Sequence, residues 1–230
     1  MLARLLSTFV ILAALPVLAS ARPVVVELFT SEGCSSCPPA DNYLSELSNS
    51  GQDVLPLAFH VTYWNNLGWK DPYSLDAATQ RQAAYSSRFG DGSYTPEMVV
   101  DGRIGFVGSD RATGEKVIRA AKANDGASVA VSGKRRDNTL SIEVGAGSGR
   151  GQVLLVGYDR EHVTAVGRGE NGGRTLTESD IVRSVQVVGE WTGASLTLNP
   201  VLPAGERAAV LVQTSNGSII GAARIDYGAS

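Results

Sequence analysis

Two cysteines, Cys34 and Cys37, are the only ones in the chain and stand three positions apart. A Cys-x-x-Cys pair can form a disulfide, bind a metal ion or exchange disulfides with other thiols. A disulfide across so short a loop restricts the unfolded chain very little, so it would add little stability. The spacing therefore favours a chemical role for the pair, with a purely structural disulfide as the alternative.

The residues on either side of the pair predict a reactive thiolate at Cys34. Residues 24–29 are apolar and rich in β-branched side chains, which predicts a buried strand. Pro38 and Pro39 suit the first turn of a helix, where the missing N–H groups would be unpaired anyway. Cys34 then lies at a helix N-terminus, where free N–H groups and the helix dipole favour negative charge. We expect Cys34 to attack a substrate disulfide and Cys37 to resolve the mixed disulfide.

The N-terminal half predicts strands and helices that would position this pair. We expect strands at residues 24–29, 54–61, 97–100 and 103–107. We expect helices at residues 38–47, at residues 75–88, and from about residue 110 to residue 124. The first two strands are joined by a helix and should be parallel, whereas Asp101-Gly102 is typical of a hairpin turn between the last two. The predicted order over residues 22–126 is β-α-β-α-β-β-α, a mixed sheet covered by helices.

Residues 127–230 predict a different, β-rich region. Their apolar segments are short and often alternate with polar residues, and Gly, Asn and Asp separate them. This pattern is typical of a small all-β unit such as a sandwich. One helical turn is expected near residues 178–182. Two arrangements stay open, because this region can fold alone or extend the first half.

Several short motifs carry a resemblance to known proteins. They include the run ELFTSEGCSSCPPAD around the cysteines and the run YTP before the third strand. The matching segments are residues 27–41, 59–61, 63–64, 67–72, 94–96, 99–102, 169–171 and 173–176. With these motifs the chain resembles the thioredoxin superfamily and, within it, a secreted family known as domain of unknown function 1223. The resemblance covers nearly the whole chain after residue 21. It implies a thioredoxin-like fold with an appended β-rich part, and no known substrate.

The resemblance implies further catalytic residues. In thioredoxin-like folds a cis-proline begins the third strand and faces the dithiol, and the Thr95-Pro96 bond occupies that place. The backbone of Thr95 would then bind a substrate peptide through strand-like hydrogen bonds. Thioredoxin also buries an acid beneath its dithiol, where a raised pKa suits proton transfer. Glu27 is the candidate for that acid, with a solvent-facing place at a strand edge as the alternative.

The residues that border the cysteines depart from the thioredoxin pattern. Gly33 stands where thioredoxin has an aromatic residue, and Ser35 and Ser36 match neither the strong reductants nor the strong oxidants of the superfamily. We expect these three residues to contact the substrate. They do not predict whether the pair oxidises or reduces it.

Further side chains are candidates for binding a substrate. His60 is expected near the end of a strand, where ligands collect in open α/β sheets, with a satisfied interior histidine as the alternative. Trp64, together with Tyr63 and Trp69, predicts an apolar platform for unfolded or peptide substrates, with core packing as the alternative. Asp41 is expected to be a first-turn charge that favours the helix dipole.

Charge and composition exclude some partners. The formal net charge is -3, and no basic stripe of the kind that binds nucleic acid is present. The short basic run at residues 134–136 is expected to be a solvated turn. Residues 170–174 form a glycine-rich stretch, but they lack the strand-to-helix pattern of phosphate-binding loops. We therefore expect no nucleic acid and no nucleotide as partner.

The N-terminal segment predicts export from the cytoplasm. Residues 1–21 contain a short basic start, an apolar run and the small-x-small end Ala19-Ser20-Ala21, which together are typical of a signal peptide cleaved after Ala21. No later segment is long and apolar enough to span a membrane. The sequence predicts a soluble protein in the periplasm or outside the cell.

These inferences lead to one principal expectation and two alternatives. We expect a thiol–disulfide oxidoreductase that acts on protein, peptide or small thiols and disulfides without a dissociable cofactor. A reductant would need a membrane electron donor in an oxidising envelope. The first alternative is copper(I) binding by Cys34, Cys37 and His60, because copper(I) prefers thiolates, although copper-delivery relatives separate their cysteines by three residues. The second is a non-catalytic interaction module with the pair locked as a disulfide.

Overall fold

The computed structural model describes residues 22–51, 53–124, 128–225 and 227. The predicted signal peptide at residues 1–21 lies outside the described residues. Within the described part of the chain, no helix is long and apolar enough to cross a membrane.

The N-terminal half has the predicted thioredoxin-like order β-α-β-α-β-β-α. Its elements are β1 (Val24–Thr30), α1 (Pro38–Asn49), β2 (Val54–His60), α2 (Asp76–Phe89), β3 (Glu97–Val100), β4 (Ile104–Val107) and α3 (Arg111–Ala123). β1 pairs with β2 in parallel and with β3 antiparallel, and β3 and β4 form a hairpin. Asp101 and Gly102 have φ of 48° and 63°, as a two-residue turn with two left-handed positions requires.

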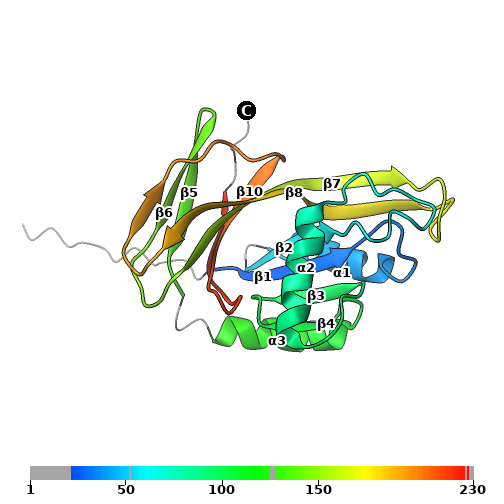
Figure 1. The fold of residues 1–230 in the computed structure, drawn as a ribbon, viewed down its shortest axis with the longest axis horizontal. Helices are drawn as coiled ribbons and strands as arrows, with labels where there is room; N and C mark the ends of the chain where they lie inside the picture. The colour runs from blue at the N-terminus through cyan, green and yellow to red at the C-terminus, as the bar shows by residue number, and fades with distance from the viewer. Residues whose placement is uncertain (1–21, 52, 125–127, 226, 228–230) are drawn as a thin grey trace, which may run out of the picture.

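Helices cover both faces of this sheet, so the side chains on both faces of β1 are buried. Val26 and Leu28 pack with side chains of α1 and α3, whereas Val25 and Phe29 pack with side chains of α2. Figure 1 shows α2 crossing in front of the sheet. This alternation decides which side chains of β1 can reach the start of α1.

The C-terminal half is made of strands, as predicted. They are β5 (Val131–Arg136), β6 (Thr139–Val144), β7 (Gly151–Ala165), β8 (Thr175–Trp191), β9 (Leu196–Leu198), β10 (Arg207–Gln213) and β11 (Ile219–Ile225). The basic run at residues 134–136 is the exposed end of β5 rather than a turn. The expected helical turn at residues 178–182 is wrong, because these residues lie within β8. There β8 pairs with β7 on one side and with β2 at Ala58 and Ile181 on the other.

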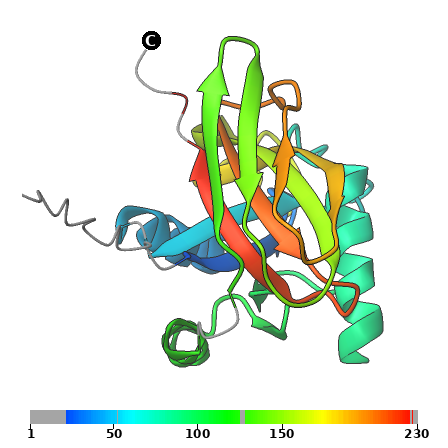
Figure 2. The same ribbon diagram turned by 90° about the vertical axis from the view of Figure 1, so that its left-hand side faces the viewer.

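The two halves share one sheet, so the β-rich C-terminal region extends the sheet of the first half. Its eight strands follow the order β11-β10-β7-β8-β2-β1-β3-β4. The remaining sheet, β5-β6-β9, packs over β7, β10 and β11 and forms a sandwich with them. Figure 2 shows this small sheet in front of the large one. The long β7–β8 hairpin runs from the sandwich to the opposite end of the molecule (Figure 1).

The shared sheet predicts one cooperative unfolding transition. Leu154 of β7 is 5% exposed and packs in the same core as Phe29 and Tyr85 of the first half. We expect Leu154→Ala to lower the free energy of unfolding by about 2 to 5 kcal/mol, because it leaves a cavity in this core. Urea denaturation followed by circular dichroism and by tryptophan fluorescence should give coincident transitions.

Val187, the partner of Leu154 across the β7–β8 pair, offers a matched control. It is 55% exposed, so Val187→Ala should change the free energy of unfolding by less than about 1 kcal/mol. Two separate transitions in the unmodified protein would contradict a single core that includes both halves.

Candidate functional site

Cys34 and Cys37 form a disulfide at the start of α1, with an S–S distance of 2.09 Å and Cα atoms 5.4 Å apart. Cys37 is the N-cap residue of the helix, and its carbonyl accepts hydrogen bonds from the N–H groups of Ala40 and Asp41. The side chains of both cysteines are buried, whereas the Ser35 and Ser36 between them are exposed. The pair therefore lies at the N-terminus of a helix, as predicted.

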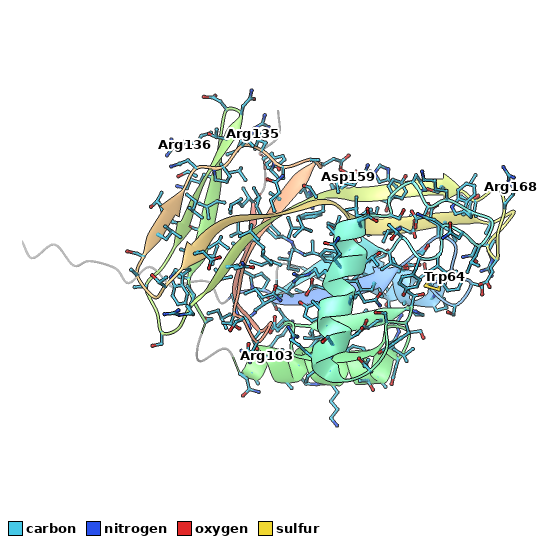
Figure 3. The ribbon with its side chains drawn as sticks, viewed as in Figure 1. Trp64, Arg103, Arg135, Arg136, Asp159 and Arg168 are labelled. Atoms are coloured by element: carbon cyan, nitrogen blue, oxygen red, sulfur yellow. A yellow bond between two sulfur atoms is a disulfide. The ribbon has the colours of Figure 1, made fainter. Side chains whose placement is uncertain are left out.

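A tryptophan joins the residue before Cys34 to the residue before the cis-proline. The Thr95-Pro96 bond is cis, as predicted. The indole N–H of Trp64 donates a hydrogen bond to the Thr95 hydroxyl at 2.8 Å. A Cβ at Gly33 would lie 3.3 Å from the Cβ of Trp64, which leaves no room for a large side chain before Cys34. Figure 3 shows Trp64 beside the disulfide.

The expected apolar platform is only partly exposed. Tyr63 is 39% exposed, and the neighbouring Leu67 is 57% exposed. Trp64 is half-buried, and Trp69 donates a hydrogen bond to the Glu32 carboxylate at 2.6 Å. Trp69 also lies against Gly169 of the β7–β8 hairpin tip, so it packs this tip against the loop after β2.

The β7–β8 hairpin tip contacts the segment that carries the pair. The side-chain amide of Asn171 donates hydrogen bonds to the carbonyls of Glu32 and Cys34, both at 2.9 Å. Arg174 in turn donates a hydrogen bond to the Asn171 side-chain oxygen at 2.9 Å. The Glu170 carboxylate accepts the Ser35 N–H at 3.1 Å. Sequence reasoning gave this segment no role, and the only signal for it was its place in the family motif.

A buried ion pair lies at the end of β2. His60 Nδ1 is 2.8 Å from Asp71 Oδ2, and both side chains are buried. Burial by itself would lower the pKa of His60, but the Asp71 and Glu178 carboxylates raise it to about 10. Burial would likewise raise the pKa of Asp71, yet the His60 charge and the Glu32 and Tyr73 N–H groups lower it. His60 is therefore a buried, ion-paired histidine, but its Nε2 has no hydrogen-bond partner among the described residues, so it is not the fully satisfied interior histidine of the alternative.

Three further carboxyl groups surround this pair. Burial raises the pKa of Asp41 to about 7 and that of Glu178 to about 8, and it also raises the pKa of Glu32. The Thr30 hydroxyl donates a hydrogen bond to Asp41 at 2.7 Å, while both Glu178 oxygens have no hydrogen-bond partner. Glu178 Oε1 lies 3.9 Å from His60 Nε2. These carboxyl groups can hold protons near neutral pH.

Asp41 lies in the first turn of α1, as predicted, but burial raises its pKa to about 7, so it is not a constant charge at the helix start. Its side chain is buried because it points from α1 toward Thr30 at the end of β1. A cavity of about 320 Å³ between α1 and β8 is lined by both Asp41 and Glu178 and also by Pro38, the residue after Cys37. The protonatable carboxyls thus adjoin the start of the helix that carries the pair.

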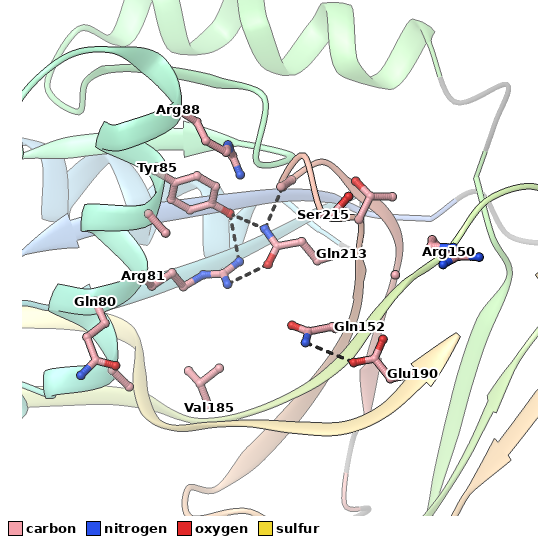
Figure 4. A pocket seen from close by; sticks show the side chains of 15 residues that line it. Gln80, Arg81, Tyr85, Arg88, Arg150, Gln152, Val185, Glu190, Gln213 and Ser215 are labelled. Atoms are coloured by element: carbon pink, nitrogen blue, oxygen red, sulfur yellow. Dashed lines mark hydrogen bonds between the residues drawn. The ribbon is translucent and has the colours of Figure 1, made fainter. Parts of the chain in front are cut away.

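Glu27 lies elsewhere, on the face of β1 that packs with α2. Its carboxylate accepts hydrogen bonds from the Arg81 guanidinium and the Tyr85 hydroxyl. Arg81 also binds Gln213, and this network lies at a cavity of about 620 Å³ (Figure 4). Glu27 is fully buried, so the solvent-facing alternative is wrong, and it does not occupy the place beneath the dithiol.

Among the described residues, no group of three or more His, Cys, Asp or Glu side chains is arranged to hold a metal ion. The copper ligands suggested by the sequence are therefore not brought together in this disulfide form. His60 Nδ1, moreover, is already held by Asp71.

Comparison with known proteins identifies the family. A family model described as "Protein of unknown function (DUF1223)" matches residues 25–213. The chain belongs to the DUF1223 family. The matched range of this DUF1223 protein includes the cysteine pair, the cis-proline and the β7–β8 hairpin tip.

Two solved structures are similar to this DUF1223 protein. Protein AGR_C_4864 from Agrobacterium tumefaciens is 33% identical, with a TM-score of 0.81 over 92% of this chain and 97% of that chain. HBP35 of Porphyromonas gingivalis is 17% identical, with a TM-score of 0.62 over 91% of this chain and 78% of that chain, and shows likeness of fold alone. No curated protein matches the sequence significantly.

The buried carboxyls predict that stability falls as pH rises. Because the pKa values of Asp41 and Glu178 are raised to about 7 and about 8, the folded protein binds more protons than the unfolded chain above about pH 4. The free energy of unfolding should therefore decrease with pH, on the order of 1 kcal/mol per pH unit, up to about pH 8. His60 extends this decrease toward its pKa of about 10. Urea midpoints of the oxidised protein across this range measure the effect.

Glu178→Gln removes one of these ionisations and should flatten the pH dependence, with the largest gain in stability at the alkaline end. Glu161→Gln changes an exposed residue of the same hairpin and should leave the dependence as it is. A midpoint that rises from about pH 5 to about pH 9 would contradict the raised pKa values.

Proposed function

We propose that this DUF1223 protein is a thiol–disulfide oxidoreductase of the periplasm or the extracellular space. The observation that carries the proposal is the Cys34–Cys37 pair at the start of α1. A dithiol at a helix N-terminus has a stabilised thiolate, and thiolates perform disulfide exchange. The location rests on the signal peptide that residues 1–21 predict.

The proposed reaction proceeds through a mixed disulfide. In the direction of substrate reduction, the Cys34 thiolate attacks one substrate sulfur, and the other substrate sulfur leaves as a thiolate. The Cys37 thiolate then attacks Cys34 Sγ, which forms the protein disulfide and releases the second substrate thiolate. The protein loses two electrons to the substrate, and the two thiol protons end on the two substrate thiols. The reverse sequence oxidises a dithiol substrate.

The buried carboxyls supply a route for these protons. Asp41 lies one helical turn after Cys37, and its pKa of about 7 lets it both accept and return a proton near neutral pH. Glu178, with a pKa of about 8, lines the same cavity. General acid–base catalysis works best with groups whose pKa is near the working pH.

A second function is favoured by one observation, the burial of both cysteine side chains. A locked disulfide in a non-catalytic interaction module would also be buried. The two functions differ in whether the pair exchanges with external thiols, so one measurement separates them.

The reduction potential of the pair is that measurement. The protein that begins at Arg22 is equilibrated in glutathione or dithiothreitol buffers, with Cys34→Ser as the control that has no disulfide. Exchange with a potential between about -270 and about -120 mV is expected of an oxidoreductase, and the value distinguishes reductants from oxidants and isomerases. A pair that resists reduction well below about -300 mV would overturn the proposal and favour the locked module.

Asp41→Asn should slow disulfide exchange of the reduced protein by about tenfold or more near neutral pH, because it removes the proposed proton acceptor for Cys37. The rate of oxidation by glutathione disulfide, measured by rapid mixing across a pH series, should also lose its inflection near the Asp41 pKa. Asp53→Asn, at an exposed aspartate whose side chain is 83% accessible, is the matched control. Equal rates and equal pH profiles in the Asp41 and Asp53 variants would argue against this role.

A further inference from the structure

The β7–β8 hairpin tip places a carboxylate against the segment that carries the reactive cysteine. Glu170 Oε2 accepts the backbone N–H of Ser35, the residue that follows Cys34, at 3.1 Å. Both Glu170 and Ser35 are exposed, and hydrogen bonds from the Ser35 side chain and from its backbone N–H lower the pKa of Glu170. The carboxylate is therefore charged across the pH range in which thiols react.

The hairpin tip is held in this position by buried contacts. Asn171 is fully buried and ties the tip to the carbonyls of Glu32 and Cys34. Arg174 fixes the orientation of the Asn171 amide through its oxygen. The position of Glu170 relative to Ser35 thus depends on contacts that do not involve Glu170 itself.

A carboxylate at this position acts differently on the two redox states of Cys34. A thiolate on Cys34 would be stabilised by the positive end of the α1 dipole. Glu170 adds a negative charge to the segment that holds Cys34 and occupies the N–H group of the next residue, Ser35. Two like charges that are near each other repel, whereas the disulfide is neutral and is not repelled. Glu170 therefore disfavours the reduced, ionised state relative to the disulfide.

We propose that Glu170 is a positioning residue that binds the Ser35 N–H and destabilises the thiolate form of Cys34. The dithiol is thereby a stronger reductant. The inference rests on the proposed oxidoreductase function and assigns its regulation to the appended β-rich half. The other titratable or charged groups around the pair are the carboxyls of Glu32, Asp41, Asp71 and Glu178, the His60 imidazole and the Arg174 guanidinium. They stay in place when Glu170 alone is substituted.

Glu170→Gln tests the proposal in the full mature chain, because glutamine keeps the size of the side chain and removes its charge. We expect a lower Cys34 pKa, measured by thiolate absorbance of the reduced protein across a pH series. We also expect the equilibrium constant with glutathione to shift about three- to tenfold toward the dithiol. The difference from the unmodified protein should shrink at high salt, since an exposed charge is screened.

Two further variants make the result specific. Glu161→Gln removes an exposed carboxylate of β7 away from the tip and should leave the Cys34 pKa and the glutathione equilibrium unchanged. Asn171→Ala releases the tip that positions Glu170, so it should move both quantities in the same direction as Glu170→Gln. A purely structural role for Glu170 would change the urea midpoint without moving the Cys34 pKa.

The outcomes separate this inference from the proposed function. If the unmodified pair exchanges with glutathione but Glu170→Gln leaves the Cys34 pKa and the equilibrium unchanged, the role of Glu170 is overturned and the oxidoreductase function stands. If the pair does not exchange at all, the function fails. The Cys34 pKa of chemically reduced protein then still tests the effect of Glu170 on the thiolate.

Discussion

The pairing of β8 with β2 is the constraint on which the candidate site depends. In this pairing Ile181 lies opposite Ala58 in parallel strands. From there the β7–β8 pair extends back to the beginning of β8, where the hairpin tip meets the cysteine segment. Glu178 thereby enters the buried cluster with His60, and the hairpin tip reaches the cysteine segment. Without this pairing, the N-terminal half would keep its cysteines but lose the groups that cover and charge their surroundings.

The buried charges near the pair are compatible with a stable fold because most of them neutralise one another. His60 and Asp71 form an ion pair with further hydrogen bonds from backbone N–H groups, which offsets part of the cost of burial. Asp41 and Glu178 lower that cost in another way, since their raised pKa values let them stay neutral. Such groups can take up or release protons when a nearby charge changes.

The closed surroundings of the disulfide set a geometric condition for reactivity. Both cysteine side chains are buried, whereas Ser35 and Ser36 between them are exposed. Trp64 lies against Gly33 and donates a hydrogen bond to Thr95, and Asn171 of the hairpin tip donates hydrogen bonds to the carbonyls of Glu32 and Cys34. Hydrogen bonds of the tip to carbonyls are individually modest, on the order of 1 kcal/mol each.

The sequence alone determined the local features of this protein. The Cys-x-x-Cys pair before two prolines, the order of strands and helices over the first half and the Asp101-Gly102 turn all follow from neighbouring residues, whereas the cis-proline was expected from the family resemblance. Backbone propensity and turn chemistry act over a few positions, so a single sequence displays them. The β-rich character of the second half was visible for the same reason.

Only the tertiary structure decided which side chains meet at the pair. Residues 178–180 have polar side chains that gave no strand pattern, and residues 178–182 lie in β8 because strands pair with this segment on both sides. Glu27 was assigned to the dithiol by its distance along the chain, but the alternation of β1 turns it toward α2, whereas Asp41 turns toward Thr30. Glu170 and Asn171 lie more than a hundred positions from the cysteines. Contacts between such distant segments depend on strand pairing and register, which local sequence patterns do not encode.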